Sequence, residues 1–410
     1  MDTLFQIQEN LLKGLNKRDI YVRNFYRNFD FVNRIMGVVG PRGVGKTTFM
    51  LHYLHNNYAD STKALYVSAD NIYFSKNTLF DLAGDFIKYH SGELLLIDEI
   101  HRYSDWSREL KNIYDSYPEL RVLFSGSSSI DLVRSKYDLS RRVILRHMFG
   151  FSFREYLEVT LKKEFPTLTL EELLSGDKTP QVREIEKIRG VLGHFEDYLK
   201  FGYYPTSFEL EDETAFVESL NNVIDKTIYE DISSFYSLKT QNLEALKKLL
   251  YFFATSSPGG LSINKLAGSV GKDNATIASY LQMLRDTGLL SFLMPDKLGH
   301  ALVRNAEKIY IANPNMLWAV GFSLGKPVGK GNLRETFAVA ALDSASYTPF
   351  YSDKGDFALN DYVLEVGGPN KGSSQLDSVE EGRGFLLKDG LQYASGKVVP
   401  LYMLGFLMSS

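Results

Sequence analysis

The 410-residue chain is 44% hydrophobic and 13% aromatic, which is enough apolar material for two to three packed domains. Cysteine is absent and the seven histidines show no paired metal-binding spacing, so disulfides and thiolate sites are excluded and no zinc site is expected. A net charge of −4 argues against general nucleic-acid binding. Because neither a basic leader nor an apolar run of about 18 residues occurs, we expect a cytoplasmic protein without a membrane span.

A phosphate-binding motif occurs early in the chain. Residues 35–50 read IMGVVGPRGVGKTTFM, which indicates a buried strand, a glycine-rich loop and a helix that begins at Lys46–Thr48. In this context the loop N–H groups and the positive end of the helix bind phosphate oxygens. We expect Lys46 to hold the β- and γ-phosphates of ATP and the Thr47 hydroxyl to ligate Mg²⁺. The predicted nucleotide-binding residues are Gly40, Pro41, Arg42, Gly43, Val44, Gly45, Lys46, Thr47 and Thr48.

The second part of the predicted site follows an apolar run. Residues 92–101, GELLLIDEIH, are typical of a parallel-sheet strand that is buried on both faces. Asp98 at its carboxyl end is expected to hold Mg²⁺, and Glu99 to polarise the attacking water. An acidic helix cap after an ordinary strand is the alternative interpretation.

Further strands complete the expected sheet. Residues 63–70, KALYVSAD, and residues 121–129, RVLFSGSSS, each indicate a short strand. Ser125 in the later strand is a candidate sensor of the γ-phosphate or the lytic water, and a plain strand end is the alternative. The alternation of strands and helices over residues 35–130 predicts an open parallel sheet.

Several segments together resemble a known family. GPRGVGKTT, LLLIDEIHRYSDWSRELKNIYD, LFSGSSSIDL and FGFSFREYL are similar to a prokaryotic family of AAA-type ATPases that carries a C-terminal domain of unknown function related to restriction-type nucleases. The resemblance implies ATP binding and hydrolysis. In that family a glycine–arginine pair follows the sensor strand, and this chain has Arg141 and Arg142 there. The resemblance implies that Arg142 meets the γ-phosphate, in cis or from a neighbour in a homo-oligomer. Arg141 and Arg146 compete for the role, and a basic strand edge is the alternative.

The middle of the chain is predicted to be helical. Residues 151–245 contain amphipathic segments interrupted by the glycine–proline turn GYYPTSF, and they resemble the helical lid of such ATPases. The four aromatic residues near this turn are expected to belong to the core rather than to a base-stacking surface. They are Tyr198, Phe201, Tyr203 and Tyr204.

A winged helix-turn-helix is expected over residues 246–310. After the linker SSPGG, a first helix is predicted over Ile263–Val270, with a turn at Gly271 and Asn274 as N-cap of a second helix that ends near Asp286. Strands of the wing follow. The second helix offers few groups to DNA bases, so DNA binding and docking of a protein partner both remain open. Its candidate base-contacting residues are Asn274, Ser279, Tyr280 and Gln282.

The last region, residues 311–410, resembles a degenerate restriction-type nuclease. Such folds place an acidic residue on a helix, an Asp at a strand end and Glu-x-Lys on the next strand, where the carboxylates hold a divalent metal. Glu335, Asp356 and Glu365 occupy the acidic positions, but Gly367 stands at the lysine position. We expect an inactive domain. A nuclease that uses Lys371, folded back from the following loop, and an unrelated α/β hairpin are the alternatives.

The sequence as a whole predicts an α/β protein with four parts. They are a P-loop ATPase core over 1–150, a helical lid over 151–245, the winged helix over 246–310 and the nuclease-like domain over 311–410. The expected activity is Mg²⁺-dependent ATP hydrolysis that drives conformational change between core, lid and winged helix. An ATP-switched DNA-binding regulator is the first alternative and a metal-dependent nuclease is the second.

Overall fold

A computed structural model describes residues 1–126, 139, 141–175, 179–210, 212–236, 238–259, 262–295 and 308–408. The chain forms two compact units, residues 1–149 and residues 150–410, and each is described by itself. No helix in the described ranges combines the length and the apolar composition that a membrane crossing requires.

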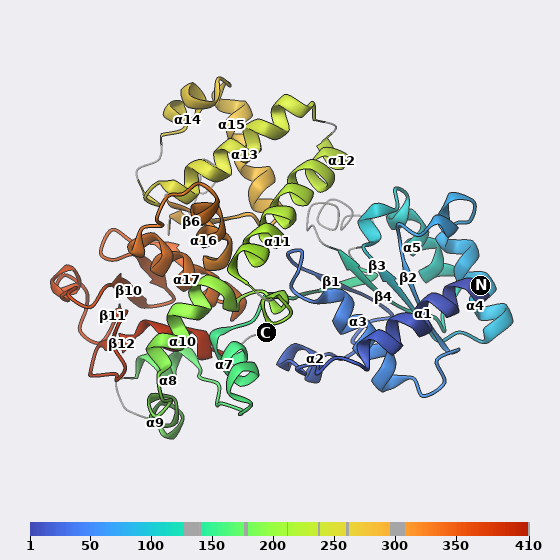
Figure 1. Cartoon of the computed structure of the whole chain (residues 1–410), viewed down its shortest axis with the longest axis horizontal. Helices are drawn as coiled ribbons and strands as arrows, with labels where there is room; N and C mark the ends of the chain where they lie inside the picture. The colour runs from blue at the N-terminus through green and yellow to red at the C-terminus, as the bar shows by residue number, and fades with distance from the viewer. Residues whose placement is uncertain are drawn as a thin grey trace. The chain divides into compact units, whose positions relative to one another are not determined.

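The first unit is built on a parallel sheet. Its five described strands lie in the order β2-β3-β4-β1-β5, with all neighbouring strands parallel (Figure 1). The strands are β1 (Ile35–Val39), β2 (Ala64–Ser68), β3 (Leu94–Asp98), β4 (Arg121–Gly126) and β5 (Val143–His147). β1 and β3 are buried at every residue, as continuous apolar runs require when helices cover both faces. The predicted parallel α/β sheet is confirmed.

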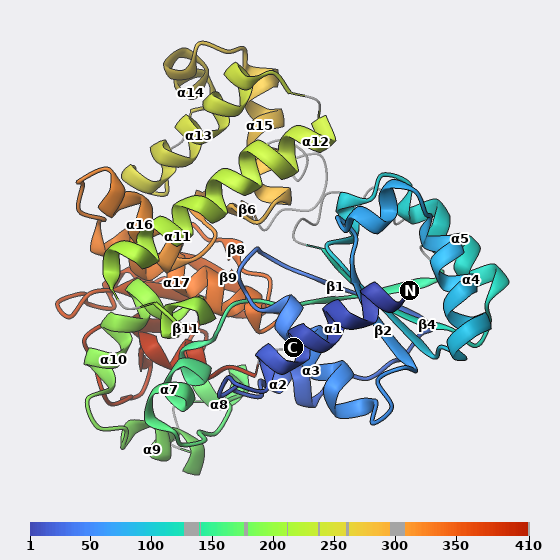
Figure 2. The same ribbon diagram turned by 45° about the vertical axis from the view of Figure 1, so that its right-hand side comes forward.

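Helices cover both faces of this sheet. α1 (Asp2–Leu15) and α3 (Lys46–Asn57) pack together on one face, while α4 (Leu79–His90) and α5 (Trp106–Ser116) pack together on the other (Figure 2). Right-handed crossovers produce this division, because the chain moves across the sheet one way through α3 and back through α4 and α5. The remaining short helices are α2 (Asn24–Arg27), η1 (Ile72–Ser75) and η2 (Ile100–Arg102).

A buried side chain from α1 protects the edge of the sheet. The amide of Gln8, which is 1% exposed, donates to the carbonyls of Ser61 and Ala64 and accepts from the backbone N–H of Tyr66 at 2.6 Å. Backbone groups that an edge strand leaves unpaired are thus satisfied by a side chain. This contact fixes β2, and with it Tyr66, relative to the rest of the sheet.

The second unit begins with a helical region. Its described helices are α7 (Phe153–Leu161), α8 (Leu170–Leu174), α9 (Pro180–Glu186), α10 (Val191–Asp197), η3 (Tyr198–Gly202), η4 (Pro205–Phe208), α11 (Glu213–Lys226), η5 (Thr227–Ile232), α12 (Ser233–Tyr236), α13 (Thr240–Thr255), α14 (Ile263–Val270), α15 (Asn274–Asp286), α16 (Pro314–Ser323), α17 (Lys330–Ser344), η7 (Ser374–Leu376) and η8 (Leu401–Phe406). The second predicted helix of the winged motif begins one residue earlier than expected. Its N-cap is Asp273, whose carboxylate accepts from the N–H of Thr276, so the expectation for Asn274 is corrected.

A mixed sheet runs through the rest of the second unit. Seven described strands lie in the order β12-β11-β10-β9-β8-β6-β7. Their bounds are β6 (Leu290–Pro295), β7 (Lys308–Ile311), β8 (Phe350–Tyr351), β9 (Phe357–Leu359), β10 (Tyr362–Gly367), β11 (Gly384–Lys388) and β12 (Val398–Pro400). β9 and β10 form an antiparallel pair. β6 pairs with β7 on one side and with β8 on the other.

The three regions predicted as separate domains therefore share one unit. β6 and β7, expected to form a wing, belong to the same sheet as the C-terminal strands. One hydrophobic core also contains residues of 153–199 together with residues of 337–407. Tyr198, Tyr203 and Tyr204 are buried, so the expectation that the aromatic residues near the turn belong to the core holds for these three, whereas Phe201 is only partly buried. Linker composition alone did not reveal that strand pairing and packing continue across the expected boundaries.

Candidate functional site

The P-loop occupies the turn between β1 and α3. Gly45 has φ of 100° at the N-cap of α3, a left-handed conformation that favours glycine. A Cβ on Gly40 would lie 2.0 Å from the carbonyl oxygen of Met148, which follows β5. The two glycines therefore meet different requirements, one of backbone conformation and one of close backbone approach. Together they allow the loop N–H groups to lie before the first turn of α3, where the helix favours an anion.

Lys46 and Thr47 open this helix. The buried Lys46 side chain donates from Nζ to the carbonyls of Gly40 at 2.8 Å and Pro41 at 2.7 Å. Its ammonium group therefore lies within the loop that the motif predicts as the phosphate site. Thr47 donates from Oγ1 to Oδ2 of Asp98 at 2.6 Å. The structure thus brings both predicted metal-binding side chains together.

Asp98 is the centre of a hydrogen-bond network at the carboxyl edge of the sheet. Its side chain is buried, at 4% exposure of the residue. Oδ2 accepts from Thr47 and also from the hydroxyl of Tyr66 on β2 at 2.7 Å. Oδ1 accepts from the hydroxyl of Ser125 on β4 and from the N–H of Glu99 at 3.2 Å. Three neighbouring strands and α3 thus fix this carboxylate, as a buried charge requires.

Ser125 and Tyr66 both donate hydrogen bonds to the Asp98 carboxylate. The Ser125 oxygen also accepts from the N–H of Glu99 at 3.0 Å, so it orders two consecutive residues of the predicted site. Burial, and then the negative charge of Asp98, strongly raise the pKa of Tyr66. Its hydroxyl therefore keeps its proton and remains a donor. The sequence did not identify Tyr66 as part of the site, because its contact with Asp98 follows only once β2 is known to lie beside β3.

Glu99 follows the strand in an unusual backbone conformation. Its φ of 50° and ψ of 46° turn the chain sharply after β3. The carboxylate lies 3.7 Å from Nη1 of Arg42 and 3.6 Å from Nε of Arg102. Because these separations exceed hydrogen-bond lengths, the arginines bias the position of Glu99 while it keeps acceptor capacity.

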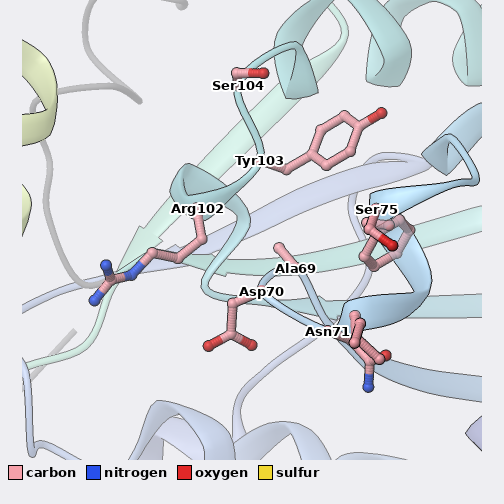
Figure 3. A pocket seen from close by; sticks show the side chains of 9 residues that line it. Ala69, Asp70, Asn71, Ser75, Arg102, Tyr103 and Ser104 are labelled. Atoms are coloured by element: carbon pink, nitrogen blue, oxygen red, sulfur yellow. The ribbon is translucent and has the colours of Figure 1, made fainter.

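A cavity lies next to these residues. It has a volume of about 480 Å³ and is formed where the segments after β2 and β3 meet, with Asp70, Asn71 and Arg102 among its lining residues (Figure 3). Figure 3 shows the Arg102 side chain extending to one side and the ring of Tyr103 to the other. Arg102 both lines the cavity and pairs with Glu99, so the cavity adjoins the candidate catalytic edge.

Arg142 lies at the amino ends of the parallel strands, whereas the P-loop lies at their carboxyl ends. β5 is parallel to β1, with Val143 beside Ile35 and His147 beside Val39. Arg142 precedes β5, so about five residues of strand, or roughly 16 Å, separate it from the P-loop edge. It pairs instead with Asp115 at 3.1 Å. The expectation that Arg142 serves the phosphate of its own chain is therefore corrected, because a parallel strand carries its first and last residues to opposite edges.

Two of the three predicted nuclease-like carboxylates share a cation in the second unit, and the third pairs with another lysine. Nζ of Lys308 lies 2.8 Å from Oδ1 of Asp356 and 3.1 Å from Oε2 of Glu335. Lys371 folds back to Glu365, with a separation of 2.6 Å between Nζ and Oε1. Burial raises the pKa of Glu365, and the hydrogen bond from Lys371 opposes that shift. Sequence reasoning anticipated the return of Lys371 as an alternative but missed Lys308.

The second helix of the predicted winged motif, for which DNA and a protein partner were both left open, offers few free groups to DNA bases. Tyr280 is buried at 3% exposure, so it is not available to bases. Gln282 donates to Asp286 at 2.6 Å, and Asn274 donates to Asn264 at 2.5 Å. Arg285 stacks over the ring of Phe292, with 5.2 Å between the guanidinium carbon and the ring centroid. Several of the predicted base-contacting groups thus already have partners within the unit.

Two family models match parts of this chain. Residues 32–157 match the family model described as an AAA domain, and residues 192–325 match that of a domain of unknown function (DUF8612). The first match contains the P-loop, Asp98 and Glu99. The resemblance to AAA-type ATPases with a C-terminal domain of unknown function is confirmed. The second match spans α10 to α16, and thus lies mostly before the nuclease-like region.

Two archaeal relatives and one solved structure complete the comparison. An uncharacterized protein of Methanocaldococcus jannaschii is 25% identical over 90% of this chain and 83% of its own length, and a second from the same organism is 23% identical over 76% and 66%. AMPPCP-bound DnaA from Aquifex aeolicus matches 66% of this chain and 90% of its own, with 15% identity and a TM-score of 0.28. A TM-score this low supports no conclusion about fold or function.

Proposed function

We propose that this chain, whose residues 32–157 match an AAA domain, is an ATPase that binds ATP with Mg²⁺ and hydrolyses its β–γ phosphoanhydride bond. The observation that carries the proposal is the 2.6 Å hydrogen bond between Thr47 Oγ1 and Asp98 Oδ2. It joins the first turn of α3, directly after the P-loop, to the carboxyl end of β3. A hydroxyl and a carboxylate are oxygen ligands of the kind that Mg²⁺ prefers, so this donor set fits the metal.

The P-loop and the residues around it bind different parts of the nucleotide and its metal. Backbone N–H groups of residues 42–48 surround the phosphates, and Lys46 turns from the carbonyls of Gly40 and Pro41 to the β- and γ-phosphates. Thr47 and Asp98 hold Mg²⁺, which neutralises charge on the phosphoryl group when it is bound. Tyr66 and Ser125 keep the Asp98 carboxylate in place. The site is thus largely ordered before nucleotide arrives.

Glu99 is the proposed base that orients and deprotonates the attacking water. Its backbone N–H is held by Ser125 and Asp98, so its position follows that of the metal-binding carboxylate. Arg42 and Arg102 lie near its side chain in this structure. A change in either ion pair would move the Glu99 carboxylate relative to the attacking water. Because Arg42 belongs to the P-loop, this supports a turnover rate that depends on the conformation of the loop.

An arginine finger, if Arg142 supplies one, acts on a neighbouring chain. The position of Arg142 at the amino edge of β5 favours this role over one in its own site. It requires a homo-oligomer. Turnover per chain should then rise with protein concentration, and Arg142→Ala should remove that rise; a concentration-independent rate would exclude the role.

Hydrolysis is proposed to drive a conformational change that reaches the second unit, where a protein partner or DNA receives it. The contacts of α15 favour a protein partner over DNA, since Tyr280 is buried and Gln282 is already hydrogen-bonded. The switch alternative, in which ATP binding alone changes the protein, shares the same nucleotide site.

The test is ATP turnover by the purified full chain, with and without duplex DNA. Lys46→Ala should abolish nucleotide binding and turnover, whereas Glu99→Gln should bind ATP but hydrolyse it far more slowly. Stimulation by DNA would identify DNA as the partner. ATP binding without turnover under every condition would favour the switch, and unchanged turnover in Glu99→Gln would exclude Glu99 as the base.

A further inference from the structure

The acidic cluster of the second unit contains its own cation. Glu335 projects from α17, Asp356 immediately precedes β9, and Lys308 is the first residue of β7. The Lys308 ammonium lies between the two carboxylates, at 2.8 Å from Asp356 and 3.1 Å from Glu335. All three side chains are only 14–18% exposed. A positive charge thus occupies the space that these two carboxylates enclose.

Other groups of the second unit also donate to these two carboxylates. Oδ2 of Asp356 accepts from the N–H of Val366 at 2.9 Å. Oε2 of Glu335 accepts from the hydroxyl of Tyr310 at 2.7 Å, in addition to Lys308. A divalent cation such as Mg²⁺ or Ca²⁺ needs about six oxygen ligands at roughly 2.0–2.6 Å. In the part of the chain that the structure describes, no group of three His, Cys, Asp or Glu residues is placed to hold a metal ion.

Glu365 belongs to the same region but is neutralised separately. Its Oε1 lies 2.6 Å from Nζ of Lys371, a residue of the loop after β10. A Cβ on Gly367 would lie 2.4 Å from Cβ and Cγ of Lys371. The glycine at the expected lysine position therefore makes room for Lys371 to return over the strand. The residues of this cluster do not fit a divalent metal, because the Lys308 ammonium occupies the space between Glu335 and Asp356 and the Lys371 ammonium lies against Glu365.

We propose that Lys308 is a built-in replacement for the metal ion, and that the cluster is a metal-independent ionic clasp. The clasp joins three separate segments of the second unit: β7, α17 and the start of β9. Since β7 pairs with β6, it also fastens the predicted wing to the C-terminal sheet. The region therefore binds no divalent cation at these carboxylates and does not use them to cleave nucleic acid.

The test compares thermal unfolding of the full chain without nucleotide, in EDTA and in increasing Mn²⁺. Any rise in the Tm of the wild-type protein with Mn²⁺ should be equally large in Asp356→Asn. Lys308→Met, which leaves two facing carboxylates, should unfold several degrees lower in EDTA and regain part of the loss with Mn²⁺. The double variant Lys308→Met with Asp356→Asn should lose that recovery, and Lys308→Arg should resemble wild type.

A second measurement keeps the proposal testable if Lys308→Met fails to fold. Mn²⁺ binding to the wild type and to Asp356→Asn is counted by electron paramagnetic resonance, with the P-loop site common to both. Equal binding supports the clasp. One ion fewer in Asp356→Asn, or cleavage of duplex or single-stranded DNA by the wild type that this variant loses, would overturn it.

Discussion

Replacing Tyr66 by Phe removes one donor from Asp98, the carboxylate at the centre of the proposed ATP site. The lost bond, 2.7 Å from the Tyr66 hydroxyl to Asp98 Oδ2, goes to a charged group, and such bonds contribute about 1.5–3 kcal/mol. In the nucleotide-free protein Thr47 still donates to the same oxygen, so we expect a stability loss near the lower figure. In the proposed Mg²⁺ complex Thr47 would turn to the metal, and Oδ2 of the variant would then have lost both donors. If the full bond energy then opposes turnover, kcat falls about 10- to 150-fold.

The assay measures turnover against Mg²⁺ concentration, together with ATP affinity from the binding of a fluorescent nucleotide. We expect a lower kcat and a weaker response to Mg²⁺, with nearly unchanged ATP affinity, because the P-loop itself is intact. Tyr103→Phe is the matched control: its hydroxyl donates to Glu109 at 2.7 Å in the same unit. Wild-type kcat in Tyr66→Phe at every Mg²⁺ concentration, or an equal loss in Tyr103→Phe, would refute the reasoning.

Two further predictions test other parts of the molecule. Gly40→Ala places a Cβ 2.0 Å from the carbonyl of Met148, so it should cost about 1–3 kcal/mol of stability and weaken ATP binding. Gly14→Ala, whose Cβ would have nothing within 4 Å, should be neutral or slightly stabilising. Equal denaturant midpoints for the two variants would contradict this prediction. Burial raises the pKa of Glu365, so the folded state favours the protonated carboxyl more than the unfolded state does. The wild-type protein should therefore gain stability relative to Glu365→Gln as pH falls from about 7 towards 5. A difference in unfolding free energy that is constant with pH would show that burial does not shift the pKa of this group.

The sequence was sufficient for the parts of the site that adjoin one another along the chain. The P-loop, the helix that begins at Lys46 and the buried strand that ends at Asp98 are each encoded by a local pattern of glycine, polar and apolar residues. Tyr66 could not be found in that way, because its role depends on β2 lying beside β3. Strand order depends on contacts between distant parts of the chain, and the residues ALYVS do not indicate which strand lies beside them.

Arg142 and Lys308 illustrate two other limits. The resemblance suggested Arg142 by its position after the sensor strand, but the direction of β5 puts it at the other edge of the sheet. A parallel strand over residues 143–147 would by itself have predicted that Arg142 lies at the amino ends of the strands, away from the P-loop. Lys308 shows the opposite problem, because a lone lysine before an apolar strand carries no signal of the two carboxylates it meets from 27 and 48 residues away.

The shared core of the second unit has a consequence for how the chain folds during synthesis. Leu168 pairs with Leu407 through an isolated parallel bridge, and α7 packs against η8. At about 5–20 residues per second, the roughly 240 residues between Leu168 and Leu407 take roughly 12–48 s to be translated. The apolar faces of α7 to α10 must wait that long for their final partners. This region therefore folds late, and the early helices depend on other contacts, or on chaperones, to avoid aggregation in the interval.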